Sequence, residues 1–563
     1  AETTWLKFGP SWRACLSTLA RVVLVCVRNF FSTATMLGAR HTVGKRLLKC
    51  VPSALRAVRA ETTEAAPAAA SAPTLPVPAF TEVKFQKEDV AQVMLELPEF
   101  NFYEMKEPAP NPYKGLTLDR SVLYTESEPK LVAPTVEFSK LENGLKIASI
   151  DRQGLTASLG LFVSAGSRFE NPSNFGVSHM VELMAYKSTA HLSHLRTVKT
   201  LEQLGASLTS TCTAGREEMV YQIDVMREYL PLVVPLMVGN ILFPRLLPWE
   251  VKAVHGKVKE AQEALKSNPD AMINELLHKA AYCNNTLGYS GLASDRSMPY
   301  FTPETVRTYM LDNFAPERMV LVGVNVDHAE LGKWAMRSFA DYNAIPLKPR
   351  EDAKALYTGG DARVEGSSPY CHLAIGLESV PWGHAELAPI SLLQTILGGG
   401  SAVGNKIGGG SLSRLSSQVV KQSPYVASCS AFNTSYSDSG IFGIYSVVQP
   451  DKAKEMAASM TESLSGLTVV SEDELALAKT LLKSSIFRQV DDSSTMMKDL
   501  GTQLLLSGKY GSAADFAKII DGVTSSDVTA AAKKLLSSKP TVAAVGDTHT
   551  VPHYGSIEAA LSA

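Results

Sequence analysis

Three features that would point to common protein classes are missing from this sequence of 563 residues. Its most apolar stretch, Leu16–Val27, is short and contains Arg21, whereas a membrane span needs about 20 apolar residues. Its seven cysteines are scattered and never stand as C-x-x-C, which fits reduced thiols better than a disulfide framework or a zinc ribbon. Its formal net charge is only −2, so nothing in the charge suggests nucleic acid as a partner.

Acidic residues are also absent between Glu2 and Glu61, where Lys and Arg recur among Ser, Thr and apolar residues. A segment that is rich in Arg, contains Ser and lacks acids is typical of a mitochondrial presequence. We therefore interpret residues 1–60 as a presequence-like segment. A secretory signal and a membrane span are the alternatives, and the short apolar run favours neither.

Residues 61–134 lack the periodic apolar pattern of a folded domain. The first part, 61–81, is rich in Ala and Pro and is typical of a flexible linker. From Glu82 to Pro134 the chain is polar and rich in proline, with only short possible helices such as Lys87–Leu97. Such a segment cannot bury a core of its own, so we expect an extended arm that lies on a partner or acts as a spacer.

From Val136 onward, apolar segments with strand and helix periods follow each other regularly, and the order occurs twice. The segment around Gly160 resembles the one around Gly376, and TPETV at 302 resembles TSSDV at 524, with nearly equal separations. This spacing indicates a duplication. We predict an α+β fold of two homologous lobes, 135–345 and 346–563. Each would have an antiparallel sheet with helices on one side, and the lobes would face each other across a cleft.

A possible metal-binding pattern lies in the predicted helix 175–189. His179 and Glu182 stand three residues apart, as in H-x-x-E-H, but Leu183 occupies the place of the second His. A catalytic zinc site normally needs three protein ligands, and leucine has no donor atom. Glu260, in a predicted helix, is the best candidate for a further ligand. His191, His194 and His255 are the nearest other histidines, and no spacing rule places them at a metal.

A second unusual stretch, 397–415, reads LGGGSAVGNKIGGGSLSRL. So much glycine cannot form a packed element, and no phosphate-binding G-x-x-x-x-G-K-[ST] pattern is present. We interpret it as a loop that offers backbone groups to an extended peptide, with a surface loop of no function as the alternative. Further on, residues 429–445 read as two strands around a turn at Ser435–Gly440.

Over residues 135–563 the chain resembles the inverted-zincin peptidases of the pitrilysin type. Within them it is similar to the subunits of mitochondrial processing peptidase and to the related core subunits of respiratory complex III. The matching segments are NGLKIAS (143–149), AGSRFENPSNFGVSHMVELMAYKST (165–189), the region of Glu260, the glycine-rich stretch and SAFNTSYSDSGIFGIY (430–445).

The resemblance implies roles for individual residues. In catalytic members, both His residues of H-x-x-E-H and a downstream Glu bind zinc, and the Glu within the motif can act as a base toward a metal-bound water. His179, Glu182 and Glu260 stand at three of these four functional positions, and Leu183 replaces the second His. We therefore expect no catalytic residue, no bound zinc and no activity of the chain itself. In α-type members a glycine-rich loop helps to bind presequences. The corresponding positions are Gly398, Gly399, Gly400, Gly408, Gly409 and Gly410, although the middle of the loop departs from the α-type GGGGSFSAGGPGKGM.

The resemblance also implies a location and partners. We expect a non-catalytic core subunit of complex III, peripheral on the matrix side of the mitochondrial inner membrane. Its partners would be a β-type or first-core subunit, cytochrome b, cytochrome c1 and other complex III subunits, with presequence peptides as a further ligand. No haem, quinone or iron–sulfur ligand set is apparent. Two alternatives stay open: a dedicated soluble α subunit of the processing peptidase, and an active zinc metalloendopeptidase.

Overall fold

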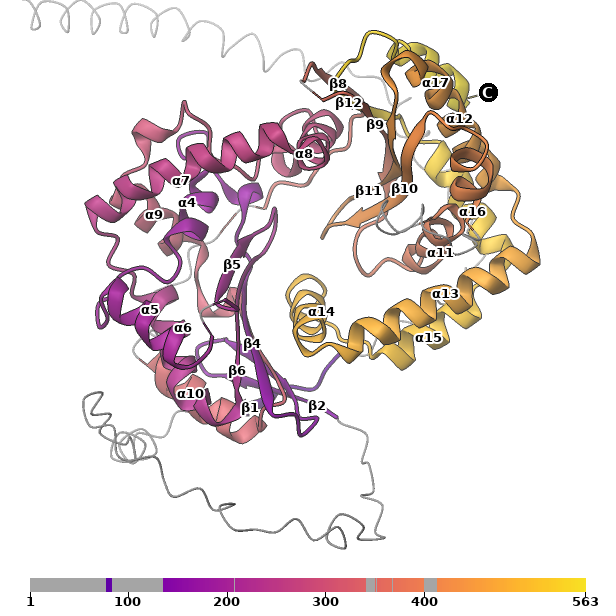
Figure 1. Cartoon of the computed structure of the whole chain (residues 1–563). Coiled ribbons are helices and arrows are strands. Elements are labelled where there is room, and N and C mark those ends of the chain that lie inside the picture. The colour runs from indigo at the N-terminus through magenta and orange to yellow at the C-terminus, as the bar shows by residue number, and fades with distance from the viewer. Residues whose placement is uncertain are drawn as a thin grey trace, which may run out of the picture. The chain divides into compact units, whose positions relative to one another are not determined.

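The computed structural model contains two β-sheets with helices packed on them (Figure 1). All described residues fall within one compact unit, Pro73–Ala563. They are 77–83, 135–206, 208–340, 350, 352–366, 368–398 and 413–562. The presequence-like segment 1–60, most of the predicted linker and arm, and the predicted boundary between the lobes at residue 345 lie outside them.

The first sheet defines lobe 1 and has the strand order β1-β2-β3-β7-β4-β6-β5. Its strands are β1 Thr81–Val83, β2 Val136–Leu141, β3 Lys146–Ile150, β4 Thr156–Val163, β5 Thr211–Ala214, β6 Met219–Met226 and β7 Met319–Val324. The helices of this half of the chain are α4 Val177–Met184, α5 His194–Gln203, α6 Leu230–Leu242, α7 Pro248–Ser267, α8 Pro269–Ala281, α9 Pro303–Asn313 and α10 His328–Phe339.

The second sheet defines lobe 2 and has the order β10-β11-β9-β12-β8. Its strands are β8 Gly360–Val364, β9 Cys371–Ser379, β10 Val426–Ser435, β11 Gly440–Val448 and β12 Thr541–Val545. The helices are α11 Leu387–Leu397, α12 Ala453–Ser465, α13 Glu472–Asp491, α14 Ser493–Leu506, α15 Ala513–Gly522, α16 Ser525–Leu536 and α17 Tyr554–Ser562. None of the helices in the described part of the chain is long and apolar enough to cross a membrane.

The two sheets repeat one topology. Read from β8, the second sheet runs β8-β12-β9-β11-β10, which matches β3-β7-β4-β6-β5 position by position. The predicted α+β lobes are therefore confirmed. The sheets are mixed rather than purely antiparallel, because β3 pairs with β7 and β8 pairs with β12 in parallel. A parallel pair needs a long crossover, and in each half the intervening helices supply it.

Local sequence explains where the elements form. The central strand β7, MVLVGV, is buried at every position, as expected for a strand covered on both faces. Helix α9 begins where the Thr302 side chain accepts a hydrogen bond from the backbone of Thr305. The equivalent helix α16 begins with a capping box between Thr524 and Asp527. The two similar TPETV and TSSDV sequences thus encode the same helix start.

The second face of each sheet is covered by a helix from the other half of the chain. Helix α14 packs on β4 and β7 of lobe 1 (Figure 1), and α8 packs on β8, β9 and β12 of lobe 2. Both helices follow the longest helix of their own half, so they occupy equivalent positions in the repeat. The side chains of α14 in this contact are Met496, Met497, Leu500 and Leu504, and those of α8 are Ile273, Leu277 and Ala281. We call α8 and α14 the exchanged helices.

Glycine makes the contact between α14 and lobe 1 possible. A Cβ atom at Gly501 would lie 2.1 Å from the ring of Phe162, and one at Gly160 would lie 2.1 Å from the sulfur of Met497. At Gly376, the equivalent of Gly160 in lobe 2, a Cβ would lie 3.3 Å from Leu277 of α8. Glycine is therefore required where the exchanged helix α14 approaches the sheet most closely.

A short piece of the predicted linker and arm is ordered on lobe 1. Thr81–Val83 form β1, which pairs in parallel with β2 at the edge of the first sheet. The ring of Phe80 packs against that of Phe138 at a centroid distance of 5.7 Å. This part of the chain contacts its own lobe, whereas the sequence suggested an arm on a partner or a spacer.

We expect Gly501→Ala to destabilise the protein, although alanine is the better helix former. The added methyl group would overlap the Phe162 ring, and overpacking of this kind costs about 1–3 kcal/mol. Gly256→Ala, in α7, is the matched control, because a Cβ there meets nothing within 4 Å. That change should stabilise by up to about 1 kcal/mol. Urea unfolding of both variants measures the difference, and equal stabilisation by both would contradict the close contact.

Candidate functional site

The residues of the degenerate motif lie on the short helix α4, which a buried carboxylate holds at its first turn. Glu170 is 5% exposed and accepts hydrogen bonds from the backbone N–H groups of Gly176, at 2.7 Å, and Ser178, at 2.9 Å. Gly176 has φ +90°, and a Cβ there would lie 2.4 Å from the backbone of Ala293. The start of α4 is thus fixed by a glycine turn and by an acidic cap at the positive end of the helix.

Helix α4 ends earlier than the sequence predicts. The pattern suggested a helix over 175–189, but the last helical residue is Met184 and Ala185 is extended. Tyr186 then takes φ +57°, a conformation that continues no right-handed helix. Thr189 instead forms a β-bridge with Pro244. The apolar pattern continues through this segment because Tyr186 is buried in the core of lobe 1, not because it is helical.

His179 lies in the interior of lobe 1 and Leu183 packs against its core. His179 is 4% exposed, and its Nδ1 has no hydrogen-bond partner among the described residues. Burial lowers the pKa of His179, so its imidazole is neutral at neutral pH. Leu183 is partly buried and adds apolar contacts one turn from the histidine.

Glu182 contacts the edge strand of the first sheet. Burial raises the pKa of Glu182 to about 7, and a hydrogen bond from the backbone N–H of Ala214 opposes this shift. Ala214 is the last residue of β5, and this N–H points away from the neighbouring strand β6. Burial, together with the nearby Glu182 carboxylate, raises the pKa of the Cys212 thiol on the same strand. Glu182 therefore pairs with one of the backbone N–H groups that β5 leaves open at the edge of the sheet.

The other proposed ligands do not complete a zinc site. Helix α7 packs against α4, but Glu260 of α7 is exposed to solvent. The side chain of His194 contacts Lys187 and the backbone oxygen of Tyr186, and His191 is exposed. Within the described ranges, no three His, Cys, Asp or Glu side chains lie together as a metal site would require. These residues do not fit a catalytic zinc ion; whether the chain binds zinc stays a prediction.

Of the glycine-rich stretch 397–415, only residues 397–398 and 413–415 belong to the described part of the chain. Gly398 ends α11 with φ +124°, and its oxygen accepts a 2.9 Å hydrogen bond from the backbone N–H of Ala431 on β10. Gln394 donates to the backbone oxygen of the same Ala431 at 3.3 Å. The loop therefore leaves the fold from the outer edge of β10. The other five predicted glycines, 399, 400, 408, 409 and 410, lie outside the described residues.

Comparison with known proteins agrees with this arrangement. A family model described as Insulinase (Peptidase family M16) matches residues 146–295, which include α4 and most of the first sheet. A second model, described as Peptidase M16 inactive domain, matches residues 300–482.

The chain belongs to peptidase family M16.

Relatives with two different names match this chain at nearly the same sequence identity. The mitochondrial-processing peptidase subunit alpha of Solanum tuberosum is 32% identical over 76% of this chain and 86% of its own length. The cytochrome b-c1 complex subunit 2 of Mus musculus is 33% identical over 74% of this chain and 91% of its own length. The human mitochondrial-processing peptidase subunit alpha is 30% identical over 77% and 88%. The family predicted from the sequence is confirmed, and these relatives are mitochondrial by name.

We expect the Glu182 carboxyl to make stability fall as pH rises. Its folded pKa of about 7 lies above the ordinary value of 4.5, so the native state binds this proton more tightly than the unfolded state. The stabilisation that this proton gives is fully present below the pKa of the unfolded state, and it is lost as pH rises through the pKa of the folded state. Glu182→Gln should therefore raise the melting temperature at about pH 8, relative to the unchanged protein, and change it little at about pH 5.

Thermal melts between these two pH values measure the effect, with Glu260→Gln as the control on an exposed glutamate. The glutamine amide still offers an oxygen to the N–H of Ala214, so the variant keeps the contact and removes only the titration. Parallel pH profiles for the unchanged chain and Glu182→Gln would contradict the assignment.

Proposed function

We propose that this chain is a non-catalytic, peptidase-like core subunit of respiratory complex III. It would pair with a β-type or first-core subunit and be peripheral on the matrix side of the mitochondrial inner membrane. The observation that carries the proposal is Leu183. It stands where a second histidine would complete H-x-x-E-H, on a helix whose surrounding framework is intact. A catalytic zinc site with one of its three protein ligands replaced by leucine would bind metal poorly.

The names of the relatives support this role and also a second role, that of a processing-peptidase α subunit. Some are named as subunits of the cytochrome b-c1 complex and others as alpha subunits of the mitochondrial-processing peptidase, and identity does not separate the two groups. The chain would therefore hold its place in complex III and also bind presequences for a catalytic partner. The polar interior around α4 fits a structural role, because Glu182 bonds a strand edge and His179 is neutral and buried.

A dedicated soluble processing-peptidase α subunit is the alternative. The position of Gly398 favours a role in peptide binding in either case. The glycine-rich loop starts beside β10, the edge strand of the second sheet, and an extended peptide can add to a sheet edge through its backbone. An active zinc metalloendopeptidase is the least favoured alternative, since it requires a site that Leu183 interrupts.

Association with complex III separates the first two alternatives. A tagged chain, extracted from mitochondrial membranes in mild detergent, should co-purify with cytochrome b, cytochrome c1 and a first-core subunit. Recovery of the chain only from the soluble fraction, with a β-type subunit and without cytochromes, would replace the complex III role by the dedicated processing role.

Zinc content and cleavage test the absence of catalysis. The purified chain alone should contain no stoichiometric zinc and should leave a presequence peptide uncut. The matched variant is Glu182→Gln, which should change neither measurement. Stoichiometric zinc together with cleavage that Glu182→Gln abolishes would overturn the proposal, since Glu182 would then act as a general base.

A loop deletion tests presequence binding by the heterodimer. Removal of residues 399–410 leaves Gly398 in place, so its hydrogen bond to β10 and the end of α11 are kept. We expect this deletion to weaken binding of a fluorescent presequence peptide about tenfold or more, which corresponds to about 1.4 kcal/mol. Replacing the same residues by a Gly/Ser linker of equal length separates loss of backbone contacts from loss of side chains. Unchanged affinity in both variants would leave only the structural role.

A further inference from the structure

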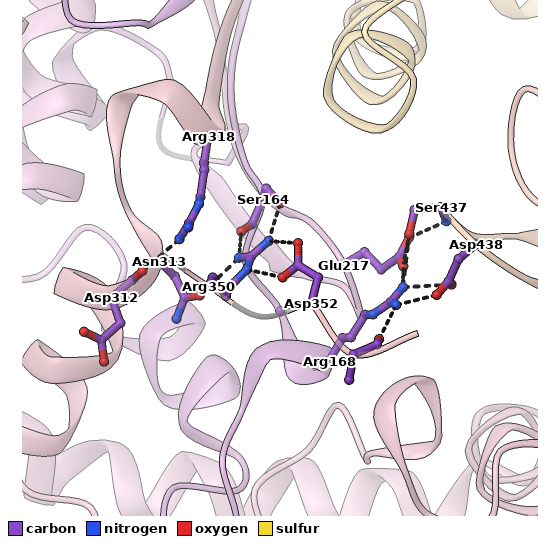
Figure 2. Close-up of polar contacts among 12 residues, drawn as sticks. Ser164, Arg168, Glu217, Asp312, Asn313, Arg318, Arg350, Asp352, Ser437 and Asp438 are labelled. Atoms are coloured by element: carbon purple, nitrogen blue, oxygen red, sulfur yellow. Dashed lines mark hydrogen bonds and ion pairs between the residues drawn. The ribbon is translucent and has the colours of Figure 1, made fainter. Parts of the chain in front are cut away.

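One buried arginine joins the two lobes. Arg168 lies in the short 3₁₀ helix Ser167–Phe169 that follows β4, and it is 9% exposed. Its guanidinium pairs with Glu217 of lobe 1 and, at 2.9 and 2.5 Å, with both carboxylate oxygens of Asp438 of lobe 2 (Figure 2). It also donates to the backbone oxygen of Ala353, in the connection between the lobes, at 2.7 Å. A two-pronged guanidinium–carboxylate pair fixes both distance and orientation.

The carboxylates come from equivalent turns of the repeated fold. Glu217 belongs to the turn 215–218 between β5 and β6, and Asp438 to the turn 436–439 between β10 and β11. Glu217 also accepts hydrogen bonds from the backbone N–H and the hydroxyl of Ser437, each at 2.8 Å. The same loop of each half thus meets its counterpart around one arginine, and we call Arg168, Glu217, Ser437 and Asp438 the lobe lock.

The turn 215–218 also reaches both exchanged helices. Arg216 pairs with Glu275 of α8 at 2.8 Å, and Glu218 accepts a hydrogen bond from Thr502 of α14 at 3.1 Å. Three successive charged residues of one turn therefore contact three different parts of the fold. A displacement of this turn would disturb all of these contacts at once.

The connection between the lobes is pinned beside the lock. The Asp438 carboxylate accepts a hydrogen bond from the backbone N–H of Ala355 at 2.8 Å. Arg350 lies over the ring of Phe169, 3.5 Å from its centroid. It also donates to the backbone oxygen of Ser164 at 2.7 Å (Figure 2). The connection is thus attached to the elements that carry the lock through the side chain of Arg350 and through the backbone of Ala353 and Ala355.

Each side of the lock continues into an element of the candidate site. On lobe 1, the turn 215–218 follows directly from Ala214, whose N–H bonds Glu182. On lobe 2, Asp438 stands at the end of the hairpin whose strand β10 holds Gly398 through Ala431.

We propose that the lobe lock is a positioning device. Asp438 of lobe 2 holds edge strand β5, and with it the α4 residue Glu182, in a fixed relation to the start of the glycine-rich loop. These two elements, one from each lobe, are then held as one rigid unit. This inference does not depend on the proposed function, because it concerns the coupling of the lobes whatever they bind.

Hydrogen exchange of the full chain tests the coupling. Asp438→Asn keeps the shape of the side chain but removes the charge that pairs with Arg168. We expect amide exchange to rise about tenfold or more in both 211–222 and 426–445, and to stay unchanged in α10 and α17. Asp361→Asn is the matched control, because Asp361 pairs with Arg363 on the half-exposed strand β8, away from the lock. It should leave both lock segments unchanged.

A milder variant keeps the test decisive if Asp438→Asn folds poorly. Ser437→Ala removes the hydroxyl that donates to Glu217 and accepts from Arg168, without leaving an unpaired charge, and should raise exchange in the same two segments by a smaller factor. Faster exchange confined to 426–445 would overturn the proposal, since lobe 2 would then not position β5. A uniform rise over the whole chain, α10 and α17 included, would also overturn it and leave a salt bridge that only stabilises.

Discussion

The reciprocal covering of the two sheets is the constraint on which the rest of this structure depends. A sheet buried on both faces needs helices on both sides, and each half of the chain supplies only one face of its own sheet. The second face of lobe 1 is closed by α14 and that of lobe 2 by α8. Neither half has a complete core without the other, so the two lobes form one cooperative structure even though each repeats the same topology.

Against this shared framework, the two halves have diverged at equivalent positions. Helix α4, after β4, carries His179 and Glu182, whereas the corresponding helix α11, after β9, ends at Leu397 and leads into the glycine-rich stretch. The turn between β5 and β6 and the turn between β10 and β11 have also diverged in sequence, since one carries Glu217 and the other Asp438. They now share one arginine. Duplication supplied the frame, and side chains at matching points supply different functions.

Much of this fold follows from sequence patterns, and the missing parts have identifiable causes. The alternating and helical periods locate most strands and helices, and the repeat predicts two similar lobes. The apolar face of α14 says that the helix is buried, but periodicity does not say which sheet buries it. Arg168, in a polar loop segment, looks solvent-exposed in sequence, and only the fold brings Asp438 to it across 270 positions. Glu260 shows the opposite case, because a family pattern picks out a residue that is exposed in this chain.

The cap of Glu170 on α4 has a consequence for how such a protein can evolve. In a metalloenzyme the ion often organises the elements that bind it, so loss of one ligand can disorder the site. Here the first turn of α4 is held by a carboxylate, a glycine turn and a serine, none of which belongs to the motif. A replacement such as Leu183 can therefore accumulate without unfolding the helix.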